Sequence, residues 1–351
     1  MGGDLVADPS VAAVVRLGDT VRFTRPPGLA AWAAVGGKKE ADGPLAAGFD
    51  LLFTDNRLGE ETWEQAESTL QRHCVELLLQ KADASAAQID LALGGDLQSQ
   101  CTATAYTFRG LDIPFAGVYG ACSTMAEALG LAACLTAGGA ADRALAMTSS
   151  HFCAAERQFR TPLNYGGKRT PTAQWTATGA GACLVTAQAG PGQVRLTAAA
   201  FGRVRDLSVK DGTNMGGAMA PAAAETLRRF FADNRCSPAG YDGVYTGDLG
   251  VVGSEMLAQL LTAEGIDLAG RHKDCGLLLY DRETQQTGAG GSGAGCAASV
   301  LAAHILPALK TGRMRRALLV CTGALMSTTT LLQGESIPAV AHLVELTAPE
   351  S

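Results

Sequence analysis

The sequence of 351 residues contains the same set of motifs twice in the same order, and this duplication restricts the possible folds more than any other feature. The buried-strand pattern Ile89–Leu97, which ends in Gly-Gly-Asp-Leu, returns as Tyr241–Leu249, which ends in Thr-Gly-Asp-Leu. In the same order, Arg143–Ser150 returns as Arg316–Gly323, each after a helix rich in small residues. Long α/β duplications form two similar layered units rather than a solenoid of short repeats. We therefore predict two such halves packed together.

Buried strands that alternate with helices favour mostly parallel sheets, so we expect an α/β fold. Helices are predicted over residues 62–81, 98–109, 123–137, 221–233 and 290–309. Strands are predicted over residues 88–97, 113–118, 143–149, 241–249, 275–280 and 316–323. Residues 1–17 are interpreted as a loose N-terminal extension, and Gly36–Gly48 as a polar surface loop. The first half is predicted to cover residues 18–205 and the second half residues 206–351.

Composition excludes several classes of function. The net charge is −6, and no basic patch with interleaved aromatic residues is present, so nucleic acid binding is not expected. Ten scattered cysteines without a Cys-x-x-Cys pair argue against a zinc site or a disulfide framework, and we expect no metal and no cofactor. The longest apolar helical stretch, Cys296–Leu309, is too short to span a bilayer, and no signal peptide is recognisable. Any membrane association is therefore expected to be peripheral.

Cys122 occupies a tight turn at the start of the predicted helix 123–137. The first turn of a helix has unpaired N–H groups and a partial positive charge, which lower the pKa of a cysteine and raise its nucleophilicity. The N–H groups of Cys122 and Ser123 can also bind an anion. The simpler interpretation of Cys122 is a buried structural cysteine in an apolar helix.

Ligands of open α/β folds bind at the carboxyl ends of the strands, which here carry Asp96, Cys122, His151, Asp248 and Gly323. Three interpretations of His151 stay open. It forms a Cys/His dyad with Cys122, it donates a hydrogen bond to a ligand carboxylate, or it is a satisfied structural histidine.

The motif Gly120-Ala-Cys-Ser, at the start of the first buried helix of a duplicated α/β chain, resembles the thiolase and ketoacyl synthase superfamily. More specific motifs are similar to the stage V sporulation protein AD family. They lie at residues 39–45, 94–97, 120–124, 148–151, 155–160, 165–167, 219–224, 246–249, 272–276, 289–293 and 334–338. The resemblance covers about residues 18–347 and implies a duplicated five-layer αβαβα sandwich with mixed, mostly parallel sheets, usually dimeric.

The family resemblance also implies a function. It implies a protein of spore-forming bacteria that binds dipicolinic acid (pyridine-2,6-dicarboxylate), alone or as its calcium chelate, and supports its uptake into the developing spore. It further implies a homodimer that lies peripherally on the cytoplasmic face of the spore inner membrane. Other stage V sporulation membrane proteins are the expected partners.

In the condensing enzymes of the superfamily, the helix-start cysteine accepts an acyl group, and a second-half His acts with another His or an Asn. This chain has neither residue type from Gly243 to Glu255, nor from Asp281 to Ala303. Loss of proton transfer and of oxyanion stabilisation each costs roughly 10²–10⁴-fold in rate. We therefore expect no catalysis and interpret Cys122 as a vestigial nucleophile. The alternatives are an acyl-transfer enzyme that uses Cys122 with His151, and a purely structural partner in a membrane-associated complex.

Dipicolinate is a flat dianion, so its site needs N–H donors in a plane and an apolar slot for the ring. Arginine suits a carboxylate because its fork donates two parallel hydrogen bonds, each contributing about 1.5–3 kcal/mol. Arg205 is a further candidate, beside Arg203, for binding a carboxylate of the ligand. Asp248 favours binding of a dianion only if its carboxyl group is protonated or if it faces calcium chelated by the ligand. The predicted ligand-binding residues are Cys122, Ser123, His151, Arg157, Arg160, Arg203, Asp248, Gly291 and Gly323.

Overall fold

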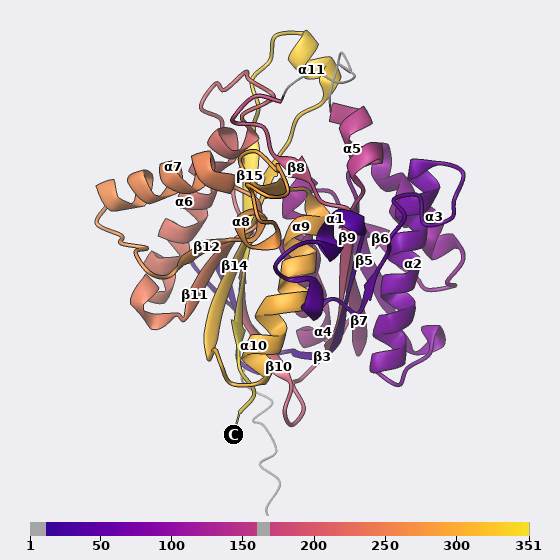
Figure 1. Cartoon of the computed structure of the whole chain (residues 1–351). Coiled ribbons are helices and arrows are strands. Elements are labelled where there is room, and N and C mark those ends of the chain that lie inside the picture. The colour runs from indigo at the N-terminus through magenta and orange to yellow at the C-terminus, as the bar shows by residue number, and fades with distance from the viewer. Residues whose placement is uncertain (1–11, 160–168, 351) are drawn as a thin grey trace, which may run out of the picture.

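The computed structural model describes residues 12–159 and 169–350, which fold into alternating layers of helices and strands (Figure 1). The strands are β1 (Val14–Leu17), β2 (Thr20–Phe23), β3 (Gly28–Gly36), β4 (Leu51–Leu52), β5 (Leu91–Gly95), β6 (Phe115–Gly117), β7 (Arg143–Ser150), β8 (Trp175–Thr176), β9 (Gly179–Thr186), β10 (Val194–Ala200), β11 (Gly243–Thr246), β12 (His272–Asp274), β13 (Gly291–Ser292), β14 (Arg316–Ala324) and β15 (Ala339–Thr347). The helices are α1 (Lys38–Ala41), α2 (Trp63–Lys81), α3 (Thr102–Arg109), α4 (Thr124–Ala137), α5 (Phe152–Phe159), α6 (Met215–Asn234), α7 (Gly250–Ala263), α8 (Cys275–Leu279), α9 (Ala294–Val300), α10 (Leu306–Lys310) and α11 (Thr328–Leu332).

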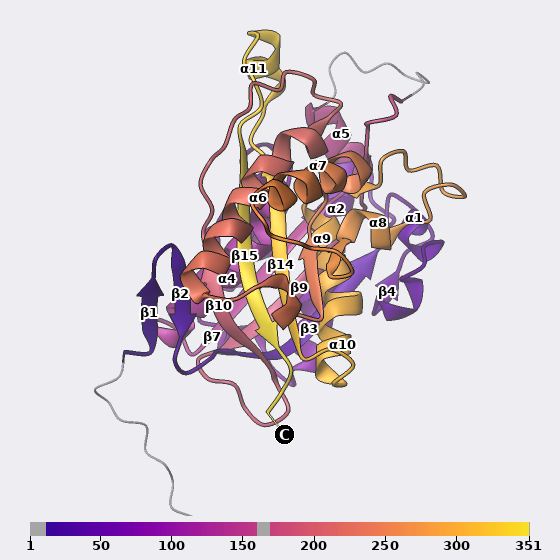
Figure 2. The same cartoon turned by 90° about the vertical axis from the view of Figure 1, so that its left-hand side faces the viewer.

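Two sets of strands lie between three helical layers, which confirms the predicted αβαβα sandwich (Figures 1 and 2). Helix α2 covers the outer face of the first set, α4 and α9 lie between the sets, and α6 and α7 cover the outer face of the second. Each interface is a separate apolar core, represented by Leu70, Leu129 and Phe230 in turn. The small-residue helices of the two halves, α4 and α9, are therefore buried on both sides.

The strand order is the same in both sets, β3-β9-β7-β5-β6 and β10-β15-β14-β11-β12. The predicted mixed, mostly parallel pairing is confirmed for the outer strands, since β5 pairs in parallel with β6 and β7, and β11 with β12 and β14. The inner strands pair in antiparallel fashion. A short antiparallel contact between β10 and β3, at Val194 and Leu29, joins the sets. The predicted division at residue 205 stays a prediction, although β10, which precedes it, lies in the second set.

Small residues allow the central helices to approach the strands closely. A Cβ atom on Gly181 of β9 would lie 2.3 Å from the carbonyl oxygen of Ala298, and one on Gly295 of α9 would lie 2.1 Å from that of Gly179. Both distances are shorter than any real contact, so α9 keeps its place only because these residues have no side chain. The high glycine content of the sequence therefore serves layer packing as well as turns.

Two predicted elements are wrong. Where a strand was predicted over residues 275–280, residues 275–279 form helix α8, because Asp274 accepts a hydrogen bond from Leu277 N at 3.2 Å and caps the helix. A short apolar run does not distinguish a strand from a buried helix by periodicity alone. Gly36–Gly48 is not a plain surface loop, since it contains α1, and Glu40 of that helix is buried. Tyr280 Oη and Thr178 N donate hydrogen bonds to Glu40, which draws the segment inward.

The predicted N-terminal extension is partly ordered structure, since β1 pairs with β2 in an antiparallel hairpin at the edge of the molecule (Figure 2). The hairpin turn is fixed by α6, where Asp233 Oδ2 accepts hydrogen bonds from Asp19 N at 2.8 Å and Thr20 N at 3.1 Å. Strand β2 then pairs with β10. The interpretation as a loose extension is therefore wrong for residues 14–17.

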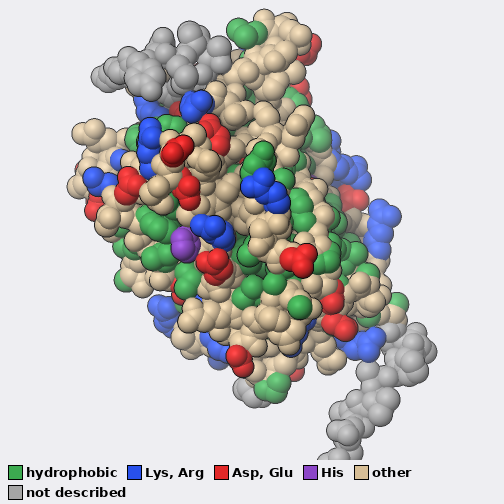
Figure 3. Space-filling view, turned by 90° about the vertical axis from the view of Figure 1, so that its right-hand side faces the viewer, with side chains coloured by type: hydrophobic (Ala, Val, Ile, Leu, Met, Phe, Trp, Pro, Cys, Tyr) green, Lys and Arg blue, Asp and Glu red, His purple; other side chains and the backbone are tan. Residues whose placement is uncertain are grey.

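The surface on the α2 side carries acidic and basic side chains interspersed among apolar ones (Figure 3). No helix in the described ranges has the length and apolar character that a bilayer crossing demands.

A buried polar network connects α2 with β5 and β7. Gln98 donates from its backbone N to Asp96 Oδ1 and from Nε2 to Glu67 Oε2, both at 2.8 Å. Ser149 Oγ donates to Glu67 Oε1 at 2.7 Å. Burial and the nearby Asp96 charge raise the pKa of Glu67 to about 8. Glu67 is therefore largely protonated at neutral pH.

The pH dependence of folding tests this network. Because the folded-state pKa of Glu67 is raised above its unfolded value, the stability from the protonated form is greatest at low pH and is lost as pH rises through about 8. From pH 7 to pH 9, the free energy of unfolding of the wild type should fall by about 1 kcal/mol more than that of Glu67→Gln. Urea denaturation at both pH values measures the difference. Glu76→Gln, on the exposed side of the same helix, is the control, and equal slopes for all three proteins would contradict the network.

Candidate functional site

Cys122 lies in a 3₁₀ turn, Ala121–Ser123, that leads directly into α4. Two side chains fix this turn: Ser123 Oγ donates to Gly120 O and Thr124 Oγ1 donates to Ala121 O, both at 2.6 Å. The backbone N of Ser123 donates to Gly120 O at 3.0 Å. The predicted anion-binding role of the Ser123 N–H is therefore wrong, because this group is already bonded and Ser123 is buried.

Asp248 faces Cys122 from the other half of the molecule, at the carboxyl end of β11. Its Oδ2 accepts hydrogen bonds from Ser292 Oγ at 2.8 Å and Gly293 N at 3.0 Å, and its Oδ1 accepts one from Thr322 Oγ1 at 2.9 Å. The charge of Asp248 also acts on the Cys122 thiol, whose pKa it raises. Asp248 is fully buried, and its carboxyl group ties β11 to the β13 turn and to β14 within the second half.

Electrostatics at Cys122 are the opposite of those predicted for a helix-start nucleophile. Burial raises the pKa of the Cys122 thiol well above its ordinary value, and the charge of Asp248 raises it further. The pKa of Asp248 is itself raised by burial, against the hydrogen bonds that it accepts. The whole Cys122 residue is only 8% exposed. The prediction of a stabilised thiolate at neutral pH is therefore wrong, and the interpretation of Cys122 as a protonated, buried cysteine is favoured.

Gly323 and the β13 turn complete this centre. A Cβ atom on Gly323 would lie 2.0 Å from the carbonyl oxygen of Gly120, so only glycine allows the end of β14 to approach the Cys122 turn. Gly291 lies in β13, where its carbonyl oxygen accepts a hydrogen bond from Gln174 Nε2 at 3.0 Å, and Ser292 follows it. The structure thus brings together Cys122, Ser123, Asp248, Gly323 and the turn that begins at Gly291.

Sequence reasoning missed Ser292, Thr322 and Asp274. The buried Asp274 accepts hydrogen bonds from Leu249 N at 2.8 Å, Gly250 N at 3.1 Å and Thr246 Oγ1 at 2.7 Å, which fixes the segment that carries Asp248. Burial raises the pKa of Asp274 to about 7, helped by the charge of Asp248. The motif at residues 272–276 contains Asp274 and is the sequence signal that could have identified it.

Among the described residues, His151 makes no hydrogen bond to the Cys122 thiol. His151 Nε2 lies 2.7 Å from the carbonyl oxygen of Asn56, and its ring lies 5.7 Å from that of Trp63. His151 Nδ1 is buried without a hydrogen-bond partner in the part of the chain that is described, so neither ring nitrogen bonds to Cys122. Burial lowers the pKa of His151, which keeps it neutral. The geometry thus gives no support to a Cys/His dyad.

The predicted arginines do not converge on Cys122. Arg157 is 53% exposed and pairs with Glu64 at 3.3 Å, on the face of α5 opposite Ala155 and Phe159. Arg160 lies outside the described residues. Arg203 and Arg205 pair with Asp19 and Glu225, respectively, beside the N-terminal hairpin.

The side chains packed around Cys122 are apolar instead. We call them the Cys122 wall: the buried Leu97, Ala121, Ala155 and Ala294, with Phe159 and Leu325 partly buried. They come from both halves of the chain and from α5. Within the described ranges, no group of three or more His, Cys, Asp or Glu side chains is arranged to hold a metal ion.

Comparison with known proteins gives a consistent result. The family model of stage V sporulation protein AD matches residues 18–347. The chain is 44% identical over 306 residues to stage V sporulation protein AD of Bacillus subtilis (strain 168), which covers 87% of this chain and 90% of that protein.

Solved structures share the fold at low sequence identity. The 3-oxoacyl-[acyl-carrier-protein] synthase III of Aquifex aeolicus VF5 has a TM-score of 0.56 at 14% identity, covering 92% of this chain and 99% of that one. OleA of Xanthomonas campestris has a TM-score of 0.57 at 14% identity, covering 95% and 99%. The tetronic acid condensing enzyme AbyA1 has a TM-score of 0.55 at 18% identity, covering 91% and 99%. These matches establish the thiolase-like fold and nothing beyond it.

The effect of Asp248 on Cys122 can be measured directly. Asp248→Asn removes the negative charge beside the thiol, so the pKa of Cys122 should fall and its alkylation by iodoacetamide should begin at lower pH. Each pKa unit corresponds to about a tenfold rate increase in the range where the thiolate is scarce. Peptide mass spectrometry assigns the label to Cys122 across a pH series, with Cys122→Ser as the control. An unchanged pH midpoint would contradict the proposed coupling, whatever happens to the absolute rate.

Proposed function

Because the chain belongs to the stage V sporulation protein AD family, we propose that it is a non-catalytic member of the thiolase-like fold that binds dipicolinate and supports its uptake into the developing spore. The observation that carries the non-catalytic part is that Cys122 is buried near the Asp248 charge and has no hydrogen bond to His151 in the described part of the chain. The ligand itself comes from the family resemblance.

An aspartate cannot replace a histidine as the base for a buried thiol. When a thiol gives its proton to a neutral imidazole, the resulting ions attract each other, which lowers the cost of the transfer. When it gives its proton to a carboxylate, the negative charge only moves from one buried group to the other. Since burial and Asp248 raise the pKa of Cys122, this transfer is unfavourable. The site is therefore proposed to bind rather than to transfer acyl groups.

The Cys122 wall is the proposed slot for the pyridine ring. Its side chains are apolar and come from segments on opposite sides of the cysteine turn, among them Leu97, Ala155 and Leu325. A dianion beside Asp248 is favourable only when that carboxyl group is protonated or when chelated calcium lies between them. Burial raises the pKa of Asp248, which favours protonation. We therefore propose that binding is strengthened by lower pH or by calcium.

The alternative is an active acyl-transfer enzyme, as the names of the structural neighbours suggest for those proteins. It would need Cys122 to ionise beside Asp248 without a bonded histidine. We further propose, from the family, a peripheral position at the spore inner membrane and other stage V sporulation membrane proteins as partners.

Calorimetry tests ligand binding. Dipicolinate should bind, and picolinate, with one carboxylate, should bind at least tenfold more weakly, because one charged hydrogen-bonding group is lost. Leu325→Glu, which adds a negative charge at the Cys122 wall, should weaken dipicolinate binding by a similar factor. Leu332→Glu adds the same charge on the exposed α11 and is the control. Titrations with and without calcium compare the free ligand with its chelate.

Two results would contradict the proposal. Equal binding of picolinate and dipicolinate would exclude recognition of the dianion. Intact-protein mass spectrometry after incubation with acyl-thioesters should show no adduct, and an adduct assigned to Cys122 with steady turnover would favour the enzyme.

We also propose a homodimer formed through the edge of the first sheet. Strand β6 ends the strand order, and Tyr106 and Tyr119 beside it are 56% and 45% exposed. Pairing with β6 of a second copy would satisfy the edge and cover these rings. Sedimentation velocity should give a dimer for the wild type and for Leu332→Glu, and a monomer for Tyr119→Glu. A monomeric wild type at micromolar concentration would contradict this proposal.

A further inference from the structure

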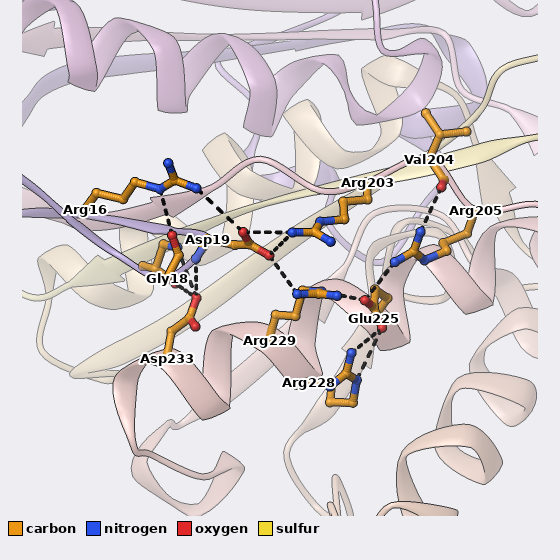
Figure 4. Close-up of polar contacts among 11 residues, drawn as sticks. Arg16, Gly18, Asp19, Arg203, Val204, Arg205, Glu225, Arg228, Arg229 and Asp233 are labelled. Atoms are coloured by element: carbon orange, nitrogen blue, oxygen red, sulfur yellow. Dashed lines mark hydrogen bonds and ion pairs between the residues drawn. The ribbon is translucent and has the colours of Figure 1, made fainter.

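Five arginines gather where the N-terminal hairpin meets α6 (Figure 4). We call them the arginine cluster: Arg16, Arg203, Arg205, Arg228 and Arg229. Their ion pairs involve three carboxylates, Asp19, Glu225 and Glu264. The fourth nearby acid, Asp233, bonds to backbone N–H groups and Thr20 of the hairpin. Cations therefore exceed anions locally in a protein whose net charge is −6.

The two central acids are held ionised, so they cannot release the guanidinium groups by taking up protons near neutral pH. Partial burial opposes the shift, but hydrogen bonds from Arg228, Arg205 and Arg229 lower the pKa of Glu225 to about 2. Arg203 and Arg229 both contact Asp19 Oδ2, at 3.1 and 3.0 Å. Two guanidinium groups of the cluster thus already contact the same carboxylate oxygen of Asp19.

Asp19 uses only part of the donor capacity of Arg203. Only Nη2 of Arg203 bonds to Asp19, and its Nε and Nη1 make no hydrogen bond within the described part of the chain. Arg203 is 51% exposed. Its backbone is nevertheless fixed, since the preceding Gly202 donates to His342 Nδ1 at 3.2 Å and has no room for a side chain beside Ala341. Arg203 therefore offers free N–H donors from a fixed position.

The surface is slightly hollowed at this point and stays open to solvent. The hollow is lined by Arg203, Arg229, Phe201 and Thr226 together with the carboxylates of Asp19, Glu225 and Asp233. Arg228, which bonds to the same Glu225 as Arg229, does not line it.

We propose that Arg203 and Arg229 form a binding site for an external phosphoryl group, distinct from the dipicolinate site. A tetrahedral phosphate dianion has more acceptor oxygens than the Asp19 carboxylate and can accept N–H donors from both guanidinium groups at once. The group belongs either to a small phosphorylated molecule or to an anionic lipid headgroup. The site lies where the hairpin, β10 and α6 meet, so occupancy would brace the hairpin against the second half.

Binding of inorganic phosphate to the full-length protein, followed by calorimetry, tests the site. Arg203→Gln should weaken phosphate binding by about tenfold or more, as expected for the loss of a charged hydrogen bond. Arg228→Gln removes the same charge from the same cluster outside the hollow and should change affinity less than about threefold. Thermal melting establishes that both variants fold. Equal losses in the two variants would reveal a general charge effect and overturn the proposal, as would a lack of phosphate binding by the wild type.

Co-sedimentation with vesicles identifies the source of the phosphoryl group. If phosphatidylglycerol vesicles bind the wild type, phosphatidylcholine vesicles do not, and Arg203→Gln abolishes the difference, the ligand is a lipid headgroup. If free phosphate binds in an Arg203-dependent way but vesicles do not, the ligand is soluble. Dipicolinate binding is measured on the same variants. It should be unaffected by Arg203→Gln, and its loss together with phosphate binding would show that the two sites are one and overturn this proposal.

Discussion

The buried carboxyl group of Asp248 is the contact on which the centre of this molecule depends. It accepts hydrogen bonds from the β13 turn and from β14, and it faces the cysteine turn that begins α4. An unpaired carboxylate in such a place would be costly, so every donor around it is also a constraint on where those segments lie. The same carboxyl group that fixes these second-half segments also raises the pKa of the Cys122 thiol.

The duplicated pattern explains why the carboxylate stands there. Asp96 occupies the corresponding place after β5, where it accepts hydrogen bonds from Gln98 and Thr104 and stabilises its own half. In the first half this aspartate serves the strand–helix connection alone. In the second half the residue at the same place meets the other half of the molecule. The same residue type, an aspartate after a buried strand, thus lies in a different environment in each half.

The layers and the position of Cys122 could be predicted from the sequence because periodicity and repetition report on local burial. Helix α4 and strand β7 followed their predicted bounds closely, since small apolar residues and the Gly138-Gly139 pair define them. The electrostatic setting of Cys122 could not be predicted, because Asp248, Ser292 and Thr322 reach it from positions more than a hundred residues away. The positions of the arginine side chains could not be predicted for a related reason. Sequence proximity to His151 or to the second half says little about which acid a long side chain meets.

In the described part of the chain, the two sets of strands pair directly through β10 and β3, at Val194 and Leu29. The register of β3, β9 and β7 places that joint at the end of the molecule opposite Ser150, and so opposite the carboxyl ends that carry the Cys122 turn. At the opposite end, β8 of the first half pairs in parallel with β13 of the second half, and Ser292 of β13 donates to Asp248. The two halves are thus bonded backbone to backbone at both ends, and the surroundings of Asp248 are set by a segment that both halves hold.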